Sequence, residues 1–380
     1  MKQIYLDYAA ATPLDTAVLD AMQPYFSRVF FNPSATYLPA VSVRKALEEA
    51  RGKVAHWLGA RPTEIIFTSG GTEANNLAIH GVMQQFPDGN VVVSAVEHES
   101  VLAPACHYRC REAAVKPDGI VDVFGLVKLI DNNTVLVSVM YANNEVGTIQ
   151  PIRQISLELE KIRAARQKAG SSRPLYLHTD AAQAANYLDL HTARLGVDLM
   201  TINGGKIYGP KGSGVLFVSR HVRLAPQLLG GGQESGQRSG TENVPGCIGL
   251  AAALDVAQTM RHEEARRLQK LQKLFLGLVE QKIPQAAING SRKHRLPNNI
   301  HVTILGADNE RLLVELEERG ILAAAGSACS ASSEEPSHVL RAMGISDQDA
   351  QASLRFTMGR QTTEDHIRYA IASLAASCYS

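Results

Sequence analysis

A lysine between glycines is the residue of this chain best suited to covalent chemistry. Lys206 stands in T-I-N-G-G-K-I-Y-G-P-K-G-S-G (201–214), after an apolar run that predicts a buried strand at 198–202. A lysine at a buried strand end is costly unless it is paired or used chemically. Desolvation also lowers the pKa of a lysine, which favours the neutral, nucleophilic amine that can form a Schiff base. Taken alone, Lys206 is more simply interpreted as a solvent-exposed loop residue.

Two other strand ends carry compatible chemistry. Asp180 follows a predicted strand at 175–179, where a carboxylate either caps the next helix or pairs with a cation. A glycine turn at 70–71 joins a strand at 64–68 to a helix that begins at Thr72. The free N–H groups and the dipole of such a helix start form an anion site. The glycine spacing is neither a dinucleotide fingerprint nor a Walker loop, so it does not specifically indicate a nucleotide.

Strands alternate with helical stretches along the first part of the chain. Further strands are predicted at 91–95, 135–140 and 214–219, the last as a candidate antiparallel strand. The alternation predicts an α/β fold with a mostly parallel sheet flanked by helices, in which ligands bind beyond the carboxyl ends of the strands. The polar residues just after strand ends are Thr72, His98, Asn144, Asp180, Gln183 and Lys206. Alone, His98 is more simply a structural or surface histidine.

The later part of the chain follows a polar, glycine-rich loop at 230–246. A loop of that length without regular structure is either functional or disordered. The other predicted elements are helices at 15–26, 40–58, 251–282 and 308–319, a strand at 300–305 and a strand–helix pair within 353–375. We therefore expect a large domain at 14–255 and a smaller α+β domain formed by 1–13 and 256–380.

Composition excludes several classes of function. The 380 residues are 45% hydrophobic and 20% charged, and a net charge of +1 gives no field that would attract nucleic acid. No apolar run of 18 residues or signal core is present, so we expect no membrane span. Five scattered cysteines indicate free thiols and a cytoplasmic protein. Cys106, His107 and Cys110 lie in a helix-like run without a second ligand pair, which favours packing over metal binding.

A thiol and a guanidinium form a second candidate centre. Cys329 lies in G-S-A-C-S-A-S-S, a small and polar segment where an accessible thiol can attack a bound intermediate. A spectator cysteine is the alternative. Arg355, in L-R-F-T-M-G-R, can clamp a substrate carboxylate with two hydrogen bonds, although a structural ion pair is the commoner use of arginine.

These groups together match pyridoxal 5'-phosphate. The aldehyde of that cofactor bonds to a lysine, and its pyridine nitrogen pairs with a carboxylate so that the ring withdraws electrons. Its phosphate needs donors of the kind found at a helix start. Lys206, Asp180 and the 70–72 turn provide all three, and each makes the simpler interpretation of the others less satisfactory.

Nine segments extend this match to nearly the whole chain. They read Y-L-D-Y-A-A-A-T-P, T-S-G-G-T-E-A-N-N-L-A-I, V-E-H-E-S-V, N-N-E-V-G-T-I-Q-P-I, H-T-D-A-A-Q, K-I-Y-G-P-K-G, G-G-G-Q-E-S-G-Q-R-S-G-T, G-S-A-C-S and L-R-F-T-M-G-R. Together they resemble the cysteine desulfurases of the class V aminotransferase superfamily, in particular the long-loop type that serves iron–sulfur cluster assembly. The resemblance implies the fold type I of pyridoxal-phosphate enzymes and the conversion of L-cysteine to L-alanine.

The resemblance also implies roles around the cofactor ring. Lys206 would hold the cofactor, and His98 would stack on the ring and move protons. Asp180 would pair with the pyridinium nitrogen. Gln183 and Asn144 would hydrogen-bond the phenolic oxygen.

Further roles follow at the phosphate. Gly71 and Thr72 would bind it, joined by Thr241 from the partner subunit of a homodimer. The family usually reads S-G-H-K where this chain has N-G-G-K at 203–206. Asn203 can still donate through its amide, but Gly205 has no side chain. A lost contact of this kind costs about 1–3 kcal/mol, so we expect weaker cofactor binding than is usual for the family, or a substitute donor.

The remaining roles concern the substrate. Arg355, with Asn144, would bind the carboxylate of L-cysteine, and Cys329 would take the sulfur as a persulfide and release L-alanine. The persulfide would pass to an iron–sulfur scaffold or an RNA-thiolation acceptor. No metal is implied at the cofactor site, although Cys329 would transiently contact an iron–sulfur cluster. The segment 32–40 lacks a histidine that the family often has. The alternatives are a selenocysteine lyase, a transaminase or a non-catalytic scaffold.

Overall fold

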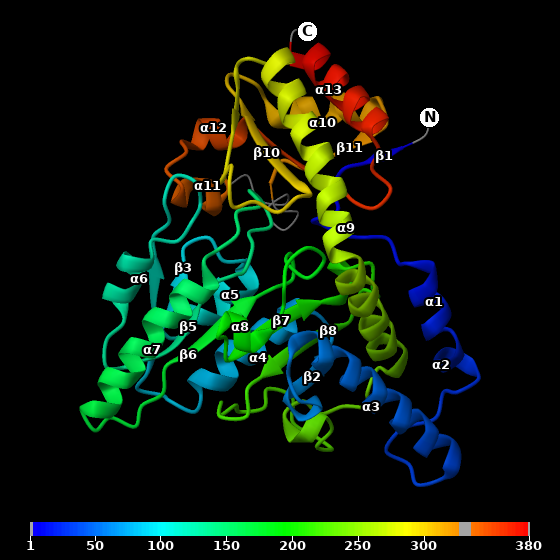
Figure 1. The fold of residues 1–380 in the computed structure, drawn as a ribbon, viewed down its shortest axis with the longest axis vertical. Coiled ribbons are helices and arrows are strands. Elements are labelled where there is room, and N and C mark those ends of the chain that lie inside the picture. The colour runs from blue at the N-terminus through cyan, green and yellow to red at the C-terminus, as the bar shows by residue number, and fades with distance from the viewer. Residues whose placement is uncertain (1–2, 327–335, 379–380) are drawn as a thin grey trace.

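A seven-stranded sheet forms the centre of the computed structural model, which describes residues 3–326 and 336–378 (Figure 1). Its spatial order is β2-β8-β7-β6-β5-β3-β4. The strands are β2 (Ile65–Thr68), β3 (Asn90–Ser94), β4 (Arg109–Ala113), β5 (Thr134–Ser138), β6 (Tyr176–Asp180), β7 (Leu199–Asn203) and β8 (Gly214–Val218). Among the described strands of this sheet, β8 alone runs in the opposite direction to the rest. The predicted α/β fold with a mostly parallel sheet is confirmed, and the strand predicted near 214–219 is the antiparallel one.

Helices cover both faces of this sheet because its strands are apolar on both sides. In β3, Val91 and Val93 join one hydrophobic cluster while Val92 joins another, as the alternation of side chains along a strand requires. The helices around the sheet are α3 (Leu38–Leu58), α4 (Gly71–Met83), α5 (Glu99–Ala105), α6 (Val123–Leu129), α7 (Ile152–Lys168) and α8 (Thr192–Leu195). Helix α4 packs in the cluster of Val91, and α3 and α7 in that of Val92.

A second, antiparallel sheet of three strands, ordered β12-β10-β9, lies beyond the first (Figure 1). The long helix α9 (Val244–Lys282) runs from one sheet to the other. The remaining elements are α1 (Thr16–Met22), α2 (Pro24–Ser27), β9 (Ala286–Ile288), β10 (Asn299–Ile304), α10 (Asn309–Glu318), α11 (His338–Ala342), α12 (Asp347–Gln351), β12 (Ser353–Thr357) and α13 (Glu364–Cys378). Strand β1 (Ile4–Tyr5) pairs with β11 (Ile321–Leu322), which ties the N-terminal arm to this region.

Three sequence predictions need correction. The helix expected at 15–26 is two helices, because Pro24 lacks the N–H that would continue α1 and instead begins α2. The helix expected from 251 begins at Val244, where the side chain of Asn243 caps it by accepting from Gly246 N. Cys110 does not lie in a helical run, because α5 ends at Ala105 and Cys110 belongs to the edge strand β4.

The predicted division into 14–255 and 1–13 with 256–380 stays a prediction. One hydrophobic cluster contains residues of both parts, such as Val137 of β5, Leu268 of α9 and Phe356 of β12. No helix among the described residues is long and apolar enough to cross a membrane.

Candidate active site

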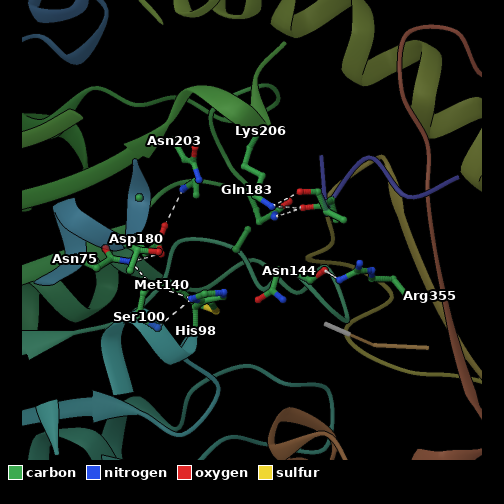
Figure 2. Close-up of a pocket in the computed structure, with 16 residues that line it drawn as sticks. Asn75, His98, Ser100, Met140, Asn144, Asp180, Gln183, Asn203, Lys206 and Arg355 are labelled. Atoms are coloured by element: carbon green, nitrogen blue, oxygen red, sulfur yellow. Dashed lines mark hydrogen bonds between the residues drawn. The ribbon is translucent and has the colours of Figure 1, made fainter. Parts of the chain in front are cut away.

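A cavity opens beyond the carboxyl ends of β5, β6 and β7 (Figure 2). The structure brings nine of the predicted site residues to its wall. They are Gly71, Thr72, His98, Asn144, Asp180, Gln183, Asn203, Lys206 and Arg355. Figure 2 shows Asp180 and His98 on one side of the cavity and Arg355 on the other, with Asn144 between them. The six polar residues that were expected to meet because they follow strand ends, Thr72, His98, Asn144, Asp180, Gln183 and Lys206, all line this cavity.

Lys206 ends a short 3-10 turn (Gly204–Lys206) that follows β7. Its ammonium donates to the carbonyl oxygens of Ala9 and Ala10, at 2.8 and 2.5 Å. Gln183 Nε2 also donates to Ala9 O, at 3.0 Å. The N-terminal arm thus lies over the lysine and the glutamine, so Lys206 belongs to the cavity wall and is not a solvent-exposed loop residue.

Asp180 is the last residue of β6, and its carboxylate is held from two sides. Oδ1 accepts from Ala182 N at 2.9 Å, as a capping aspartate does, and Oδ2 accepts from Asn75 Nδ2 at 2.7 Å. Asp180 is 7% exposed and lines the cavity. Asp180 thus caps the turn that follows β6 and also lines the cavity, and its expected pairing with a cation stays a prediction.

Asn75 and Ser100 link Asp180 to His98. Asn75 Nδ2 donates to Ser100 Oγ at 2.8 Å, and Ser100 Oγ lies 2.8 Å from His98 Nδ1. The backbone N–H of Ser100 also donates to His98 Nδ1, at 3.1 Å. Because Nδ1 accepts that bond, the proton of the neutral imidazole is on Nε2. The network therefore sets both the orientation and the tautomer of the histidine.

Glu97 is a buried carboxyl immediately before His98. Oε1 accepts from Ser94 Oγ at 2.5 Å and from Met140 N at 2.6 Å. Burial, together with the nearby negative charge of Asp180, raises the pKa of Glu97 to about 8. A neutral carboxyl here keeps a second negative charge away from the Asp180 side of the cavity.

The start of α4 forms one end of the cavity. Its first residues, Gly71 and Thr72, line both the main cavity and a more open recess that continues from it. Asn203 Oδ1 accepts from Gly205 N at 3.1 Å, which orients the amide. Asn203 Nδ2 lies 3.3 Å from the point where a Cβ on Gly71 would stand, so any side chain at 71 would crowd this end.

Arg355 reaches the opposite wall from β12. The residue is 1% exposed, and its guanidinium donates to Asp7 Oδ1 at 2.7 Å and to Asn144 O at 3.2 Å. Arg355 Nε is buried without a hydrogen-bond partner among the described residues. The arginine thus makes a structural ion pair and also lines the cavity.

The other two predicted residues do not line this cavity. Thr241 is exposed and lies in the loop before α9. Cys329 lies outside the described residues. The roles implied for both stay predictions.

Among the residues that sequence reasoning missed are four with polar or charged side chains in or next to the site, namely Asp7, Asn75, Ser100 and Lys211. Asn75 had a usable signal, because it lies three residues after Thr72 and so on the same face of α4. Asp7 and Lys211 stood inside quoted motifs but gave no sign of their spatial partners.

The donor set fits pyridoxal phosphate. An amine, a carboxylate and an imidazole share one cavity, and a helix start with an adjacent amide and hydroxyl closes its end. Lys206 would hold the cofactor, Asp180 would face its ring nitrogen, and the start of α4 would receive its phosphate.

Comparisons with known proteins agree with this chemistry. The aminotransferase class-V family model matches residues 4–369. The cysteine desulfurase IscS of Dictyoglomus turgidum is 40% identical over 378 residues, which cover 97% of this chain and 93% of the relative. A solved NifS-like protein superposes with a TM-score of 0.90 at 30% identity, covering 98% of both chains. A solved SspA in complex with cysteine superposes with a TM-score of 0.78 at 32% identity, covering 93% of this chain and 98% of the other. The chain therefore belongs to the aminotransferase class-V family and, within it, to the pyridoxal-phosphate-dependent cysteine desulfurases.

Proposed function

We propose that the chain takes sulfur from L-cysteine onto Cys329 as a persulfide and releases L-alanine. The observation that carries the proposal is the convergence of Lys206, His98, Asp180 and Arg355 on one cavity. The SspA structure that holds cysteine supports L-cysteine as the substrate.

Bound pyridoxal phosphate supplies an electron-withdrawing ring next to the substrate carbon. Asp180 provides the negative charge that keeps such a ring nitrogen protonated. His98, with Nδ1 held by Ser100, carries its transferable proton at Nε2. Arg355 orients the substrate carboxylate, and Asn144 and Gln183 line the space between the two walls.

The sulfur transfer itself needs the thiolate of Cys329. The thiolate attacks the substrate sulfur, an S–S bond forms and the C–S bond breaks. The electron pair of the broken bond goes to the substrate carbon, which takes up a proton and leaves as alanine. The terminal sulfur remains on Cys329 for an acceptor protein.

The partners in this proposal are a second copy of the chain and a sulfur acceptor. Thr241 would reach the phosphate site of the partner subunit, which its exposed position allows. The relative named IscS supports an acceptor such as an iron–sulfur scaffold, and RNA thiolation is the other route. We place the protein in the cytoplasm, where free thiols such as Cys106 and Cys247 persist.

Replacing Cys329 by alanine tests the proposal. Cys329→Ala should abolish sulfide release from L-cysteine in the presence of a reductant, because the acceptor thiol is gone. The visible absorbance of bound pyridoxal phosphate should not change. Cys106→Ala removes an exposed cysteine outside the cavity and should behave as the wild type. Undiminished sulfide release by Cys329→Ala would reject the persulfide mechanism.

A further inference from the structure

Lys211 lies beside Gly205 at the end of the cavity formed by the start of α4. A Cβ built on Gly205 would stand 3.4 Å from Lys211 Cγ and 3.5 Å from Asn203 Oδ1, which are ordinary contacts. Gly205 therefore has room for a Cβ atom. The space that a side chain there would enter borders the aliphatic stem of Lys211.

The open recess at this end has a volume of about 290 Å³. Lys211 lines it together with the turn at 69–73, Asn203, Gly205 and Lys206. Lys211 is thus part of the same surface as the N–H groups that begin α4. The stem of a lysine is flexible, so its ammonium can move within such a recess without a change of backbone.

The ammonium of Lys211 keeps donor capacity. Nζ donates to Thr12 O at 2.8 Å, which is its only hydrogen bond among the described residues. An ammonium carries three N–H donors, so two are available to a ligand.

Glu73, the one acid that lines the recess among the described residues, is engaged elsewhere. Glu73 accepts from Arg238 Nε at 2.8 Å and from Ser69 N at 2.8 Å. An anion in the recess therefore meets the positive charge of Lys211 without that charge being neutralised by Glu73. A phosphate, which carries close to two negative charges at neutral pH, gains from a full positive charge here.

We propose that Lys211 makes the contact to the cofactor phosphate that Gly205 cannot make. Its ammonium pairs with the phosphate while Asn203 Nδ2 and the first N–H groups of α4 bind the same group from the other side. Lys211 is then the substitute donor that the N-G-G-K sequence calls for, and cofactor binding is not weakened. This inference rests on the proposed placement of the phosphate at the start of α4.

Cofactor affinity of the Lys211→Met variant tests the inference. Methionine keeps much of the stem and removes the charge. Titration of apoprotein, followed by visible absorbance, should show affinity for pyridoxal phosphate lower by about 10- to 100-fold. Affinity for pyridoxal, which lacks the phosphate, should change less than about threefold. Lys45→Met, at an exposed position on α3, is the matched control and should bind both compounds as the wild type does.

A second variant separates phosphate binding from a structural role at Thr12. Gly205→His introduces a ring beside the recess. When it is combined with Lys211→Met, the affinity for pyridoxal phosphate should rise about tenfold above that of Lys211→Met alone. Gly205→His alone should raise the affinity of the wild type for pyridoxal phosphate much less, because Lys211 already makes the same contact. Equal losses for pyridoxal and pyridoxal phosphate, or no loss for either, would overturn the inference. Desulfuration by the wild type tests the proposed function separately, whatever the result for Lys211.

Discussion

The two walls of the cavity are built in different ways. On the wall formed by the seven-stranded sheet, Asp180 and His98 are held by neighbours in that wall, through Asn75 and Ser100. On the opposite wall, Arg355 of β12 is held by Asp7 of the N-terminal arm.

The difference lies in what a ligand has to displace. The partners of Asp180 are hydrogen-bond donors that orient the carboxylate and leave its charge in place, so this wall is preorganised for a cationic ring. The partner of Arg355 is itself a carboxylate. A substrate carboxylate must therefore share the guanidinium with Asp7 or replace it. One wall is ready for its ligand, and the other exchanges an internal partner for an external one.

Removing the charge of Asp180 should have the largest effect. Asp180→Asn keeps the shape of the side chain but loses the charge that would hold the ring nitrogen protonated. We expect kcat for alanine formation to fall by about 1,000-fold or more, with cofactor still bound. Asp189→Asn alters a partly exposed aspartate that pairs with Arg194 and should leave kcat unchanged. An unaltered kcat in Asp180→Asn would contradict the assignment of this wall to the cofactor.

Substitutions of Arg355 and Asp7 on the opposite wall should change KM for L-cysteine, and in opposite directions. Arg355→Lys loses paired hydrogen bonds to a carboxylate, so KM for L-cysteine should rise by about 10- to 100-fold. Asp7→Asn removes the competing charge and should lower KM by about threefold. Steady-state measurements of alanine formation distinguish the two effects. A rise in KM for both variants would show that Asp7 positions Arg355 and does not compete with the substrate.

The last prediction concerns stability and not catalysis: Glu97→Gln should change the pH dependence of the free energy of unfolding. Burial raises the pKa of Glu97 to about 8 in the folded chain, above the value of about 4.3 expected when unfolded. Stability is therefore fullest below the unfolded pKa and is lost as pH rises toward 8, at up to about 1.4 kcal/mol per pH unit.

Glutamine does not ionise, so Glu97→Gln should lose less stability than the wild type between about pH 4.5 and 8. Urea unfolding across this range measures the difference. Parallel pH curves for the two proteins would show that Glu97 is not buried as a neutral acid.

The sequence alone determined the strand ends, the residue types at them and the family. Alternation of strands and helices is a local pattern, and parallel strands bring their carboxyl ends to one edge of a sheet. That was enough to predict that Asp180, His98 and Lys206 share one cavity. The same pattern was not enough to predict that Cys110 lies in a strand or that a helix breaks at Pro24, because such a change of element depends on one or two residues.

Tertiary structure decided which groups neighbour one another within that cavity. Arg355 and Asp7 are 348 residues apart, and no periodicity links them. Asn75 meets Ser100 only because α4 and α5 pack on the same face of the sheet. From the sequence, Gly205 indicated a lost contact to the cofactor phosphate, and only the folded chain shows that Lys211 lies beside it. Hydrogen bonds and ion pairs act over a few ångströms, so their partners are set by packing and not by distance along the chain.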